Sequence, residues 1–138
     1  MEEILVLENL PEKRKKFCYV GAPKIFALEL ACRHIDDAFE SYGIYLVGSA
    51  LERPDWRDVD LRMIMADEEF FKLFPDAKGN GSWEFDARWL LLTTSISEYL
   101  SKLTELPIDF QFQPATHAND QHKGSRHAVG MRLAKEKK

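Results

Sequence analysis

The sequence predicts one small α/β domain in which helices flank a mixed β-sheet. Two kinds of periodicity carry this prediction. Apolar residues recur every three or four positions along two long segments, 23–42 and 83–103, as they do in amphipathic helices. Three shorter segments, 44–47, 58–65 and 108–112, instead have the apolar or alternating character of β-strands. The length of 138 residues is typical of a single domain.

Composition excludes several classes of protein. The chain is 45% hydrophobic and 30% charged, which is ordinary for a globular domain and unlike a disordered chain or a fibre. Its apolar runs are far shorter than the roughly 20 residues that span a bilayer. Glu2 and Glu3 stand where an export signal would carry basic residues, and Cys18 and Cys32 lack metal-ligand spacing. We therefore expect a soluble, cytoplasmic protein with reduced thiols and no membrane partner.

Charge is distributed unevenly along the chain. Residues 121–138 carry six Lys or Arg and one acid, and residues 11–16 carry four bases and one acid, although the net charge is −4. An acidic body with basic ends suits a protein that holds cations centrally and phosphates at its rim. Solvated chain ends would give the same pattern, so both interpretations stay open. Because apolar periodicity fades after Pro114, we expect residues 1–114 to form the domain and residues 115–138 a flexible basic arm.

The first predicted helix and strand follow one another directly. The helix over 23–42 has an apolar stripe, and Gly43 is placed to end it. The stripe comprises Ile25, Leu28, Cys32, Ile35 and Phe39. The strand 44–47 then stops at Gly48 and Ser49, and residues 50–56 read as a loop that starts with one helical turn.

The second strand alternates in polarity. Between residues 58 and 65, Asp58, Asp60 and Arg62 fall on the face opposite the apolar residues. A short helix to residue 74 follows, with Asp67 as its expected N-cap, and residues 75–82 form a loop.

The second long helix and the third strand complete the domain. The helix stripe comprises Trp89, Leu92, Ile96, Leu100 and Leu103. In the strand 108–112, Asp109 and Gln111 alternate with apolar residues.

The aspartates of these strands point to metal chemistry. Residues at i and i+2 of a strand lie on one face about 6.6 Å apart, so Asp58 and Asp60 can converge on cations. Asp109 joins them if its strand pairs with theirs. Hard carboxylate oxygens favour Mg²⁺ or Mn²⁺. A solvated strand face is the alternative interpretation of such alternating acids.

The turn at Gly48 and Ser49 supplies a complementary feature. A strand that turns sharply through glycine presents backbone N–H groups to an anion, and the Ser49 hydroxyl can donate one more hydrogen bond to a phosphate. Acids that bind cations beside a turn that binds phosphate form a constellation suited to phosphoryl or nucleotidyl transfer.

At these residues the chain resembles the nucleotidyltransferase superfamily related to DNA polymerase β, in its minimal single-domain form. The matching positions are Gly48, Ser49, Asp58, Asp60 and Asp109, within a resemblance that covers residues 25–112. The resemblance implies a nucleoside triphosphate such as ATP whose phosphates rest on the Gly48–Ser49 turn. It also implies that Asp58 and Asp60 hold two divalent ions, and that Asp109 ligates one of them and helps to activate an acceptor hydroxyl.

The implied reaction moves a nucleoside monophosphate to a hydroxyl or phosphate acceptor, for example on a nucleic acid or a protein. Many members have a second glycine in the gap and a serine before the first acid, whereas this chain has Arg57 at the latter position. Arg53 or Arg57 could substitute in contacting phosphate, and Arg62 beside the acids is a further candidate nucleotide-binding residue. Two alternatives stay open: a catalytically inactive, antitoxin-like binding protein with the same fold, and a metal-dependent phosphohydrolase.

Other polar and aromatic residues carry weaker signals. Trp89 is expected in the core, while Trp56 stays open between core and nucleobase platform. The histidines of the C-terminal arm are expected at the surface: His117, His122 and His127. The basic residues of the arm could contact a triphosphate or a polynucleotide: Lys123, Arg126 and Arg132.

Overall fold

A four-stranded mixed sheet forms the centre of the protein. The computed structural model describes residues 18–79, 83–124 and 126–130. Its strands are β1 (Gly43–Val47), β2 (Val59–Met65), β3 (Ile108–Pro114) and β4 (His127–Val129), in the order β3-β2-β1-β4. β1 pairs antiparallel with β2 and β4, whereas β2 and β3 run parallel. This arrangement confirms the predicted mixed α/β fold.

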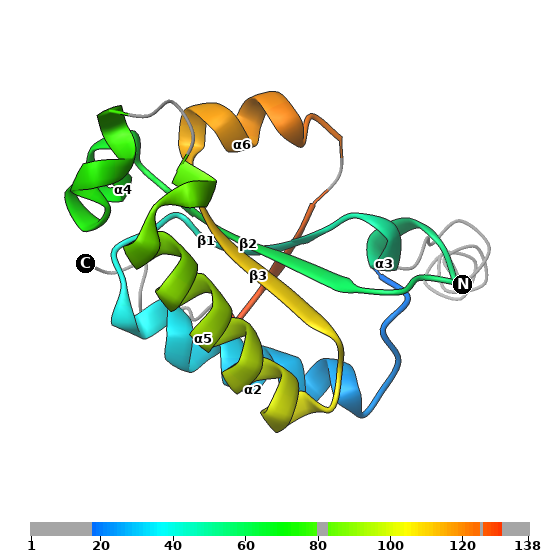
Figure 1. Cartoon of the computed structure of the whole chain (residues 1–138). Helices are drawn as coiled ribbons and strands as arrows, with labels where there is room; N and C mark the ends of the chain where they lie inside the picture. The colour runs from blue at the N-terminus through cyan, green and yellow to red at the C-terminus, as the bar shows by residue number, and fades with distance from the viewer. Residues whose placement is uncertain (1–17, 80–82, 125, 131–138) are drawn as a thin grey trace, which may run out of the picture.

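Helices cover the two faces of the sheet unequally. The long helices α2 (Lys24–Ala38) and α5 (Ala87–Thr104) lie together on one face, and α6 (Ala115–Gln121) lies on the other (Figure 1). Shorter helices connect the strands: α3 (Ser49–Glu52), α4 (Asp67–Leu73), and the 3₁₀ turns η1 (Pro75–Gly79) and η2 (Trp83–Phe85). In the described part of the chain, no helix is long and apolar enough to cross a membrane.

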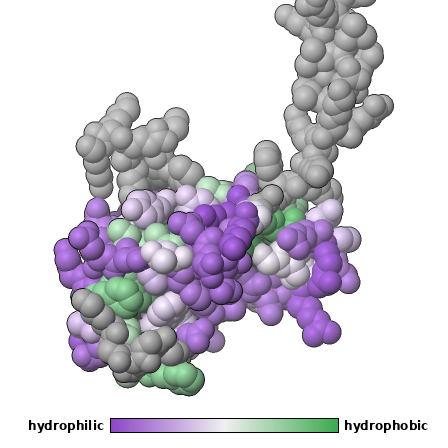
Figure 2. Space-filling view, turned by 90° about the horizontal axis from the view of Figure 1, so that it is seen from above, coloured by the Kyte–Doolittle hydropathy of each residue, from purple (hydrophilic) through white to green (hydrophobic). Residues whose placement is uncertain are grey.

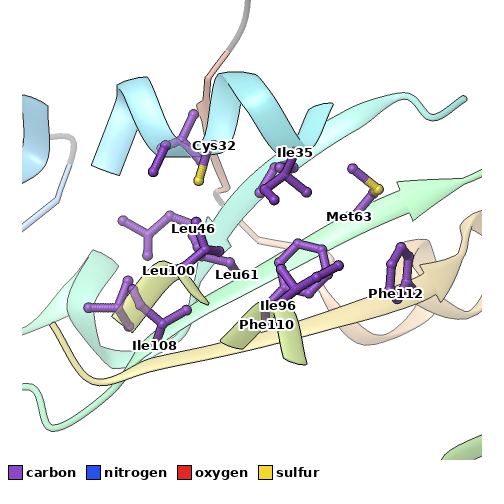
Figure 3. Close-up of a cluster of buried hydrophobic side chains, with 14 of the residues drawn as sticks. Cys32, Ile35, Leu46, Leu61, Met63, Ile96, Leu100, Ile108, Phe110 and Phe112 are labelled. Atoms are coloured by element: carbon purple, nitrogen blue, oxygen red, sulfur yellow. The ribbon is translucent and has the colours of Figure 1, made fainter. Parts of the chain in front are cut away.

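The core lies between the sheet and the two long helices. Alternate residues of β2 and β3 point into it, as their period-two polarity predicts, while α2 and α5 supply their apolar stripes (Figure 3). Phe110 and Phe112 are fully buried, and Phe112 makes edge contacts with Phe39 and Phe74. The indole N–H of Trp89 donates to the Phe112 carbonyl at 3.0 Å, which ties α5 to β3 and confirms Trp89 as a core residue.

Several element boundaries differ from the sequence prediction. Helix α2 ends at Ala38, so Gly43 does not end it but begins β1 with a φ of 125°. Helix α5 starts at Ala87 rather than residue 83, because Asp86 caps it by accepting from the Trp89 N–H. Leu103, expected in the core stripe, is 53% exposed because Thr104 takes the buried position at the end of the helix. Cys18 and Cys32 are both free thiols.

Asp67 caps a different helix from the one predicted. It lies in the first turn of α4, whose N-cap is Ala66. Its carboxylate instead accepts hydrogen bonds from the backbone N–H of Thr116 at 3.1 Å and the Thr116 hydroxyl at 2.6 Å. Thr116 is in the first turn of α6, so Asp67 satisfies an N–H group that has no acceptor within that helix.

Residues 115–124 and 126–130 differ from the expected appended arm. Helix α6 packs on β2 and β3 and buries Ala118, and β4 adds an edge strand to β1. Gly130 lies against the backbone of Cys32 and Arg33 on α2, where a Cβ would approach to 2.8 Å. The segment therefore belongs to the sheet domain, while residues 131–138 of the predicted arm, with Arg132, lie outside the described residues.

Phe112→Ala should destabilise the protein by about 3–5 kcal/mol, because the fully buried ring leaves a cavity between β3 and α4. Urea unfolding measures this as a lower midpoint with an unchanged slope. Leu91→Ala is the control, since the Leu91 side chain is 67% exposed on α5 and should cost little. A loss below about 1 kcal/mol for Phe112→Ala would contradict this description of the core.

Candidate functional site

Two carboxylates meet at the start of the parallel strand pair. Asp60 on β2 is the register partner of Asp109 on β3, and partners in neighbouring strands point to the same face of a sheet. Both side chains lie on the face opposite α2 and α5, because their neighbours Val59, Leu61 and Phe110 fill the core. The condition under which Asp109 joins the acids of the second strand is therefore met for Asp60.

Arg62 is held next to these acids. Its Nη1 donates to the carbonyl of Leu61 at 2.9 Å and to the carbonyl of Asp109 at 2.8 Å, and its Nη2 lies 3.6 Å from Asp109 Oδ2. Only 11% of the Arg62 side chain is exposed, against 47% for Asp109. The guanidinium thus bridges the two parallel strands and neutralises part of the negative charge.

The pKa of Asp60 is raised from its ordinary value. Burial is the largest cause, because it penalises the charged carboxylate. The nearby charges of Asp109 and Asp58 raise the pKa further, while Arg62 lowers it. In the folded protein without a further cation, the Asp60 carboxylate is therefore held in an unfavourable environment.

Asp58 and the neighbouring arginines stand at the rim of the site. Asp58 lies just before β2, which starts at Val59, so it is not the strand residue that alternation predicted. It is exposed and acts on Asp60 through its charge. Arg57 is also exposed, and Arg53 forms a 3.6 Å ion pair with Asp55 in the loop. Of the predicted nucleotide-binding arginines, only Arg62 is thus shown in contact with an acid of the site.

The Gly48–Ser49 turn lies directly against Asp60. Gly48 has φ 80° and ψ −155°, a backbone conformation that is essentially restricted to glycine. The conformation therefore favours glycine, and a Cβ at this position would overlap Asp60 Oδ2 and displace the carboxylate. Ser49 then begins α3, the helical turn that the sequence predicted after the first strand.

The donor set suits a hard divalent cation. Carboxylate oxygens are the ligands that Mg²⁺ and Mn²⁺ prefer. Burial, with the neighbouring acids, raises the pKa of Asp60, so a bound cation would stabilise its charged form. Asp58, Asp60 and Asp109 are the residues that would hold it. Within residues 18–79, 83–124 and 126–130, however, no three His, Cys, Asp or Glu side chains are grouped closely enough to form a ready metal site.

A second polar cluster lies farther along the same face, under α6. It contains His122 and Arg126, which the sequence placed in a surface arm. His122 is half-buried, and burial lowers its pKa, followed by the charges of Arg62, Arg126 and His117. Arg126 Nη2 donates to Asn119 Oδ1 at 2.6 Å, and its guanidinium lies 5.5 Å from the Tyr45 ring centroid. The sequence showed only that Arg126 is basic. The position of Arg126 in the structure depends on the pairing of β4 with β1.

Two further tryptophans, Trp56 and Trp83, have structural contacts. The Trp56 indole N–H donates to the Tyr19 carbonyl at 3.1 Å, and the Trp83 ring packs edge-on against His117 at 4.6 Å. These contacts fix the loop before β2 and the start of α6.

The chain matches no family model, no curated protein and no solved structure. Its function must therefore be inferred from the chemistry of the side chains. The arrangement offers a glycine turn, a pair of carboxylates on neighbouring strands, and an arginine that bridges the strands.

Gly48→Ala should destabilise the protein by about 1–3 kcal/mol, because an L-residue is strained at this φ and its Cβ overlaps Asp60. Gly124→Ala is the matched control, since no atom lies within 4 Å of a Cβ there. Chemical unfolding of Gly48→Ala, Asp60→Ala and the double variant gives their coupling. We expect the double variant to lose less than the sum of the two single losses. Strict additivity would contradict the close contact of the turn with Asp60.

Proposed function

We propose that the protein is a metal-dependent nucleotidyltransferase that moves a nucleoside monophosphate from a nucleoside triphosphate to a hydroxyl or phosphate acceptor. One observation carries the proposal: Gly48, Asp60 and Asp109 come from three separate strand ends and meet at one place on the sheet. A phosphate-binding turn beside carboxylates suits a reaction in which positioning and charge neutralisation are the main contributions of the protein.

Each residue has a distinct role in this proposal. Backbone N–H groups at the Gly48–Ser49 turn would hold the phosphates, assisted by the Ser49 hydroxyl. Asp58, Asp60 and Asp109 would hold divalent cations, which supply charge neutralisation at the triphosphate. Arg62 keeps Asp109 beside Asp60 through its bonds to β3.

The reaction forms one P–O bond and breaks another. The acceptor oxygen would attack the α-phosphorus, the bond between the α- and β-phosphates would break, and pyrophosphate would leave. A hydroxyl acceptor would give its proton to the Asp109 carboxylate. The glycine turn would place the triphosphate directly beside the acids, because the turn lies so close to Asp60 that a Cβ at Gly48 would overlap Asp60 Oδ2.

A non-catalytic binding protein is the second candidate. The Arg62–Asp109 ion pair favours it, because the charge of the third acid is already partly neutralised. Exposed apolar residues on the outer side of the long helices also suit a protein partner: Phe26, Leu30, Tyr99 and Leu103. This alternative predicts no stabilisation by triphosphate and metal.

Thermal unfolding with a panel of nucleoside triphosphates and Mg²⁺ tests the transferase proposal. A triphosphate at about 100 times its Kd should add about 2.7 kcal/mol of stability, which raises the Tm by several degrees. We expect the rise to vanish with EDTA and in Asp60→Asn, and to persist in Asp55→Asn. Asp55 is the matched control because its exposed carboxylate lies in the adjacent loop.

The products then separate the remaining reaction classes. Pyrophosphate together with a nucleotide-labelled acceptor would support transfer, whereas free phosphate or nucleoside monophosphate without any labelled product would support the phosphohydrolase. No stabilisation by any triphosphate would contradict the proposal and favour the binding protein.

A further inference from the structure

A cavity of about 220 Å³ opens on the same face of the sheet as Asp60, at the opposite end of the strands. It is lined by residues from β1, β2, α6 and the segment before β4: Tyr42, Tyr45, Ile64, Ala115, Asn119 and Arg126. An apolar cavity of about 150 Å³ is large enough to bind benzene, so this one can hold an aromatic heterocycle. Figure 2 looks onto the side that carries α6, where most of the visible described surface is hydrophilic.

The cavity walls combine ring faces with hydrogen-bonding groups. Of the lining residues, Tyr42 is 62% exposed, while Ile64 is buried. The lining also includes the Asn119 amide and the Arg126 guanidinium, which are joined by a 2.6 Å hydrogen bond. Aromatic side chains stack on nucleobases, and amide and guanidinium groups bond to the edges of the bases.

Four buried polar atoms on the outer face of the sheet lack a hydrogen-bond partner, and one of them belongs to a residue that lines the cavity, Arg126. Arg62 Nε, Gln113 Oε1, His122 Nε2 and Arg126 Nη1 are buried side-chain atoms without a hydrogen-bond partner. Buried polar groups in proteins are normally paired, so the unpaired Nη1 of Arg126 in the cavity lining points to a ligand that pairs with it. Two of the four atoms belong to guanidinium groups, which favours an anionic ligand.

The charge of Arg126 is the least compensated of this cluster. Arg62 has Asp109 within 3.6 Å, but Arg126 bonds to the neutral Asn119 and packs on Tyr45. Among the residues that the structure describes, no carboxylate pairs with Arg126. His122, whose pKa is lowered by burial and by both arginines, adds an uncharged group beside them. A phosphate is therefore attracted to Arg126 and, beyond it, to Arg62.

We propose that this cavity binds a nucleoside monophosphate unit, with its heterocycle between Tyr42 and Asn119 and its phosphate on Arg126. This inference rests on the proposed function and names its acceptor, which would be the bound nucleotide. Along β2, Arg62 lies between the cavity and the acids. A ribose hydroxyl would attack the α-phosphorus of the triphosphate, pyrophosphate would leave, and the hydroxyl proton would pass to Asp109.

Calorimetric titration with the four 5′-nucleoside monophosphates in EDTA tests the binding without the metal reaction. We expect at least one of them to bind, and the matching nucleoside and inorganic phosphate each to bind more weakly, because each retains only part of the contacts. Inorganic phosphate binding as tightly as the nucleotide would overturn the ring subsite, and no binding of any nucleotide would overturn the whole inference.

Two variants assign the binding to the cavity. Arg126→Gln should weaken nucleoside monophosphate binding about tenfold or more, through loss of the charged contact. Lys123→Gln should leave it unchanged, since Lys123 is an exposed cation two residues past α6 that pairs with Asp120. Tyr42→Ala should weaken binding through loss of stacking, with Tyr99→Ala on α5 as its control. Equal affinity in Arg126→Gln and Lys123→Gln would overturn the assignment.

Further measurements distinguish a failure of this inference from a failure of the proposed function. Asp60→Asn should still bind the nucleoside monophosphate in EDTA, because Asp60 does not line the cavity. Nucleotide binding without any metal-dependent triphosphate binding would support the subsite and contradict the transferase. Transfer activity without nucleotide binding would overturn the subsite alone.

Discussion

The parallel pairing of β2 with β3 is the constraint on which the candidate site depends. This register sets Asp60 beside Asp109 on the outer face and places Leu61 and Phe110 side by side in the core. A slip of one residue would exchange the two faces and bury the acids among the helices. The same hydrophobic packing that stabilises the fold therefore holds two like charges together. Their proximity follows from the core and needs no attraction between them.

The rest of the site moderates this repulsion in two ways. Arg62 crosses from β2 to β3 and places its guanidinium between the acids and the cavity under α6. Gly48 directly follows β1 and has no Cβ, where one would overlap Asp60 Oδ2, and so it leaves the carboxylate room on the outer face. Both features stabilise the close pair of acids. Such a pair lowers the stability of the protein by itself, but it suits the binding of cations and phosphates.

Alternating polarity predicted much of the fold and the acid pair. The residues of β2 and β3 have period two, so their faces could be assigned before any partner was known. The contacts of Arg62 could not be predicted in the same way, because they depend on a register with a strand forty-seven residues away. Likewise, Asp67 was expected to cap α4, but Thr116 competes for its carboxylate from a position forty-nine residues distant.

The last part of the domain was the least predictable. β4 has only three residues, too few to display a period, and its pairing with β1 is a contact between distant parts of the chain. Helix α6 is short and largely polar, so its sequence resembles a solvated arm. Together these two elements bring Arg126 and His122 onto the outer face. The loss of apolar periodicity after Pro114 had predicted a flexible arm for the same residues.

The stability of Asp60→Asn in EDTA as a function of pH tests the central claim most directly. Because folding raises the pKa of Asp60, this group favours the folded state at low pH, and that contribution is lost as the pH rises through the raised value. From about pH 4 to about pH 8 we therefore expect wild type to lose stability relative to Asp60→Asn, by about 1 kcal/mol or less for a half-buried group. Asp55→Asn should track wild type, and Mg²⁺ should restore wild type but not Asp60→Asn. The account would be contradicted if Asp60→Asn were less stable than wild type at every pH and Mg²⁺ changed the stability of both proteins equally.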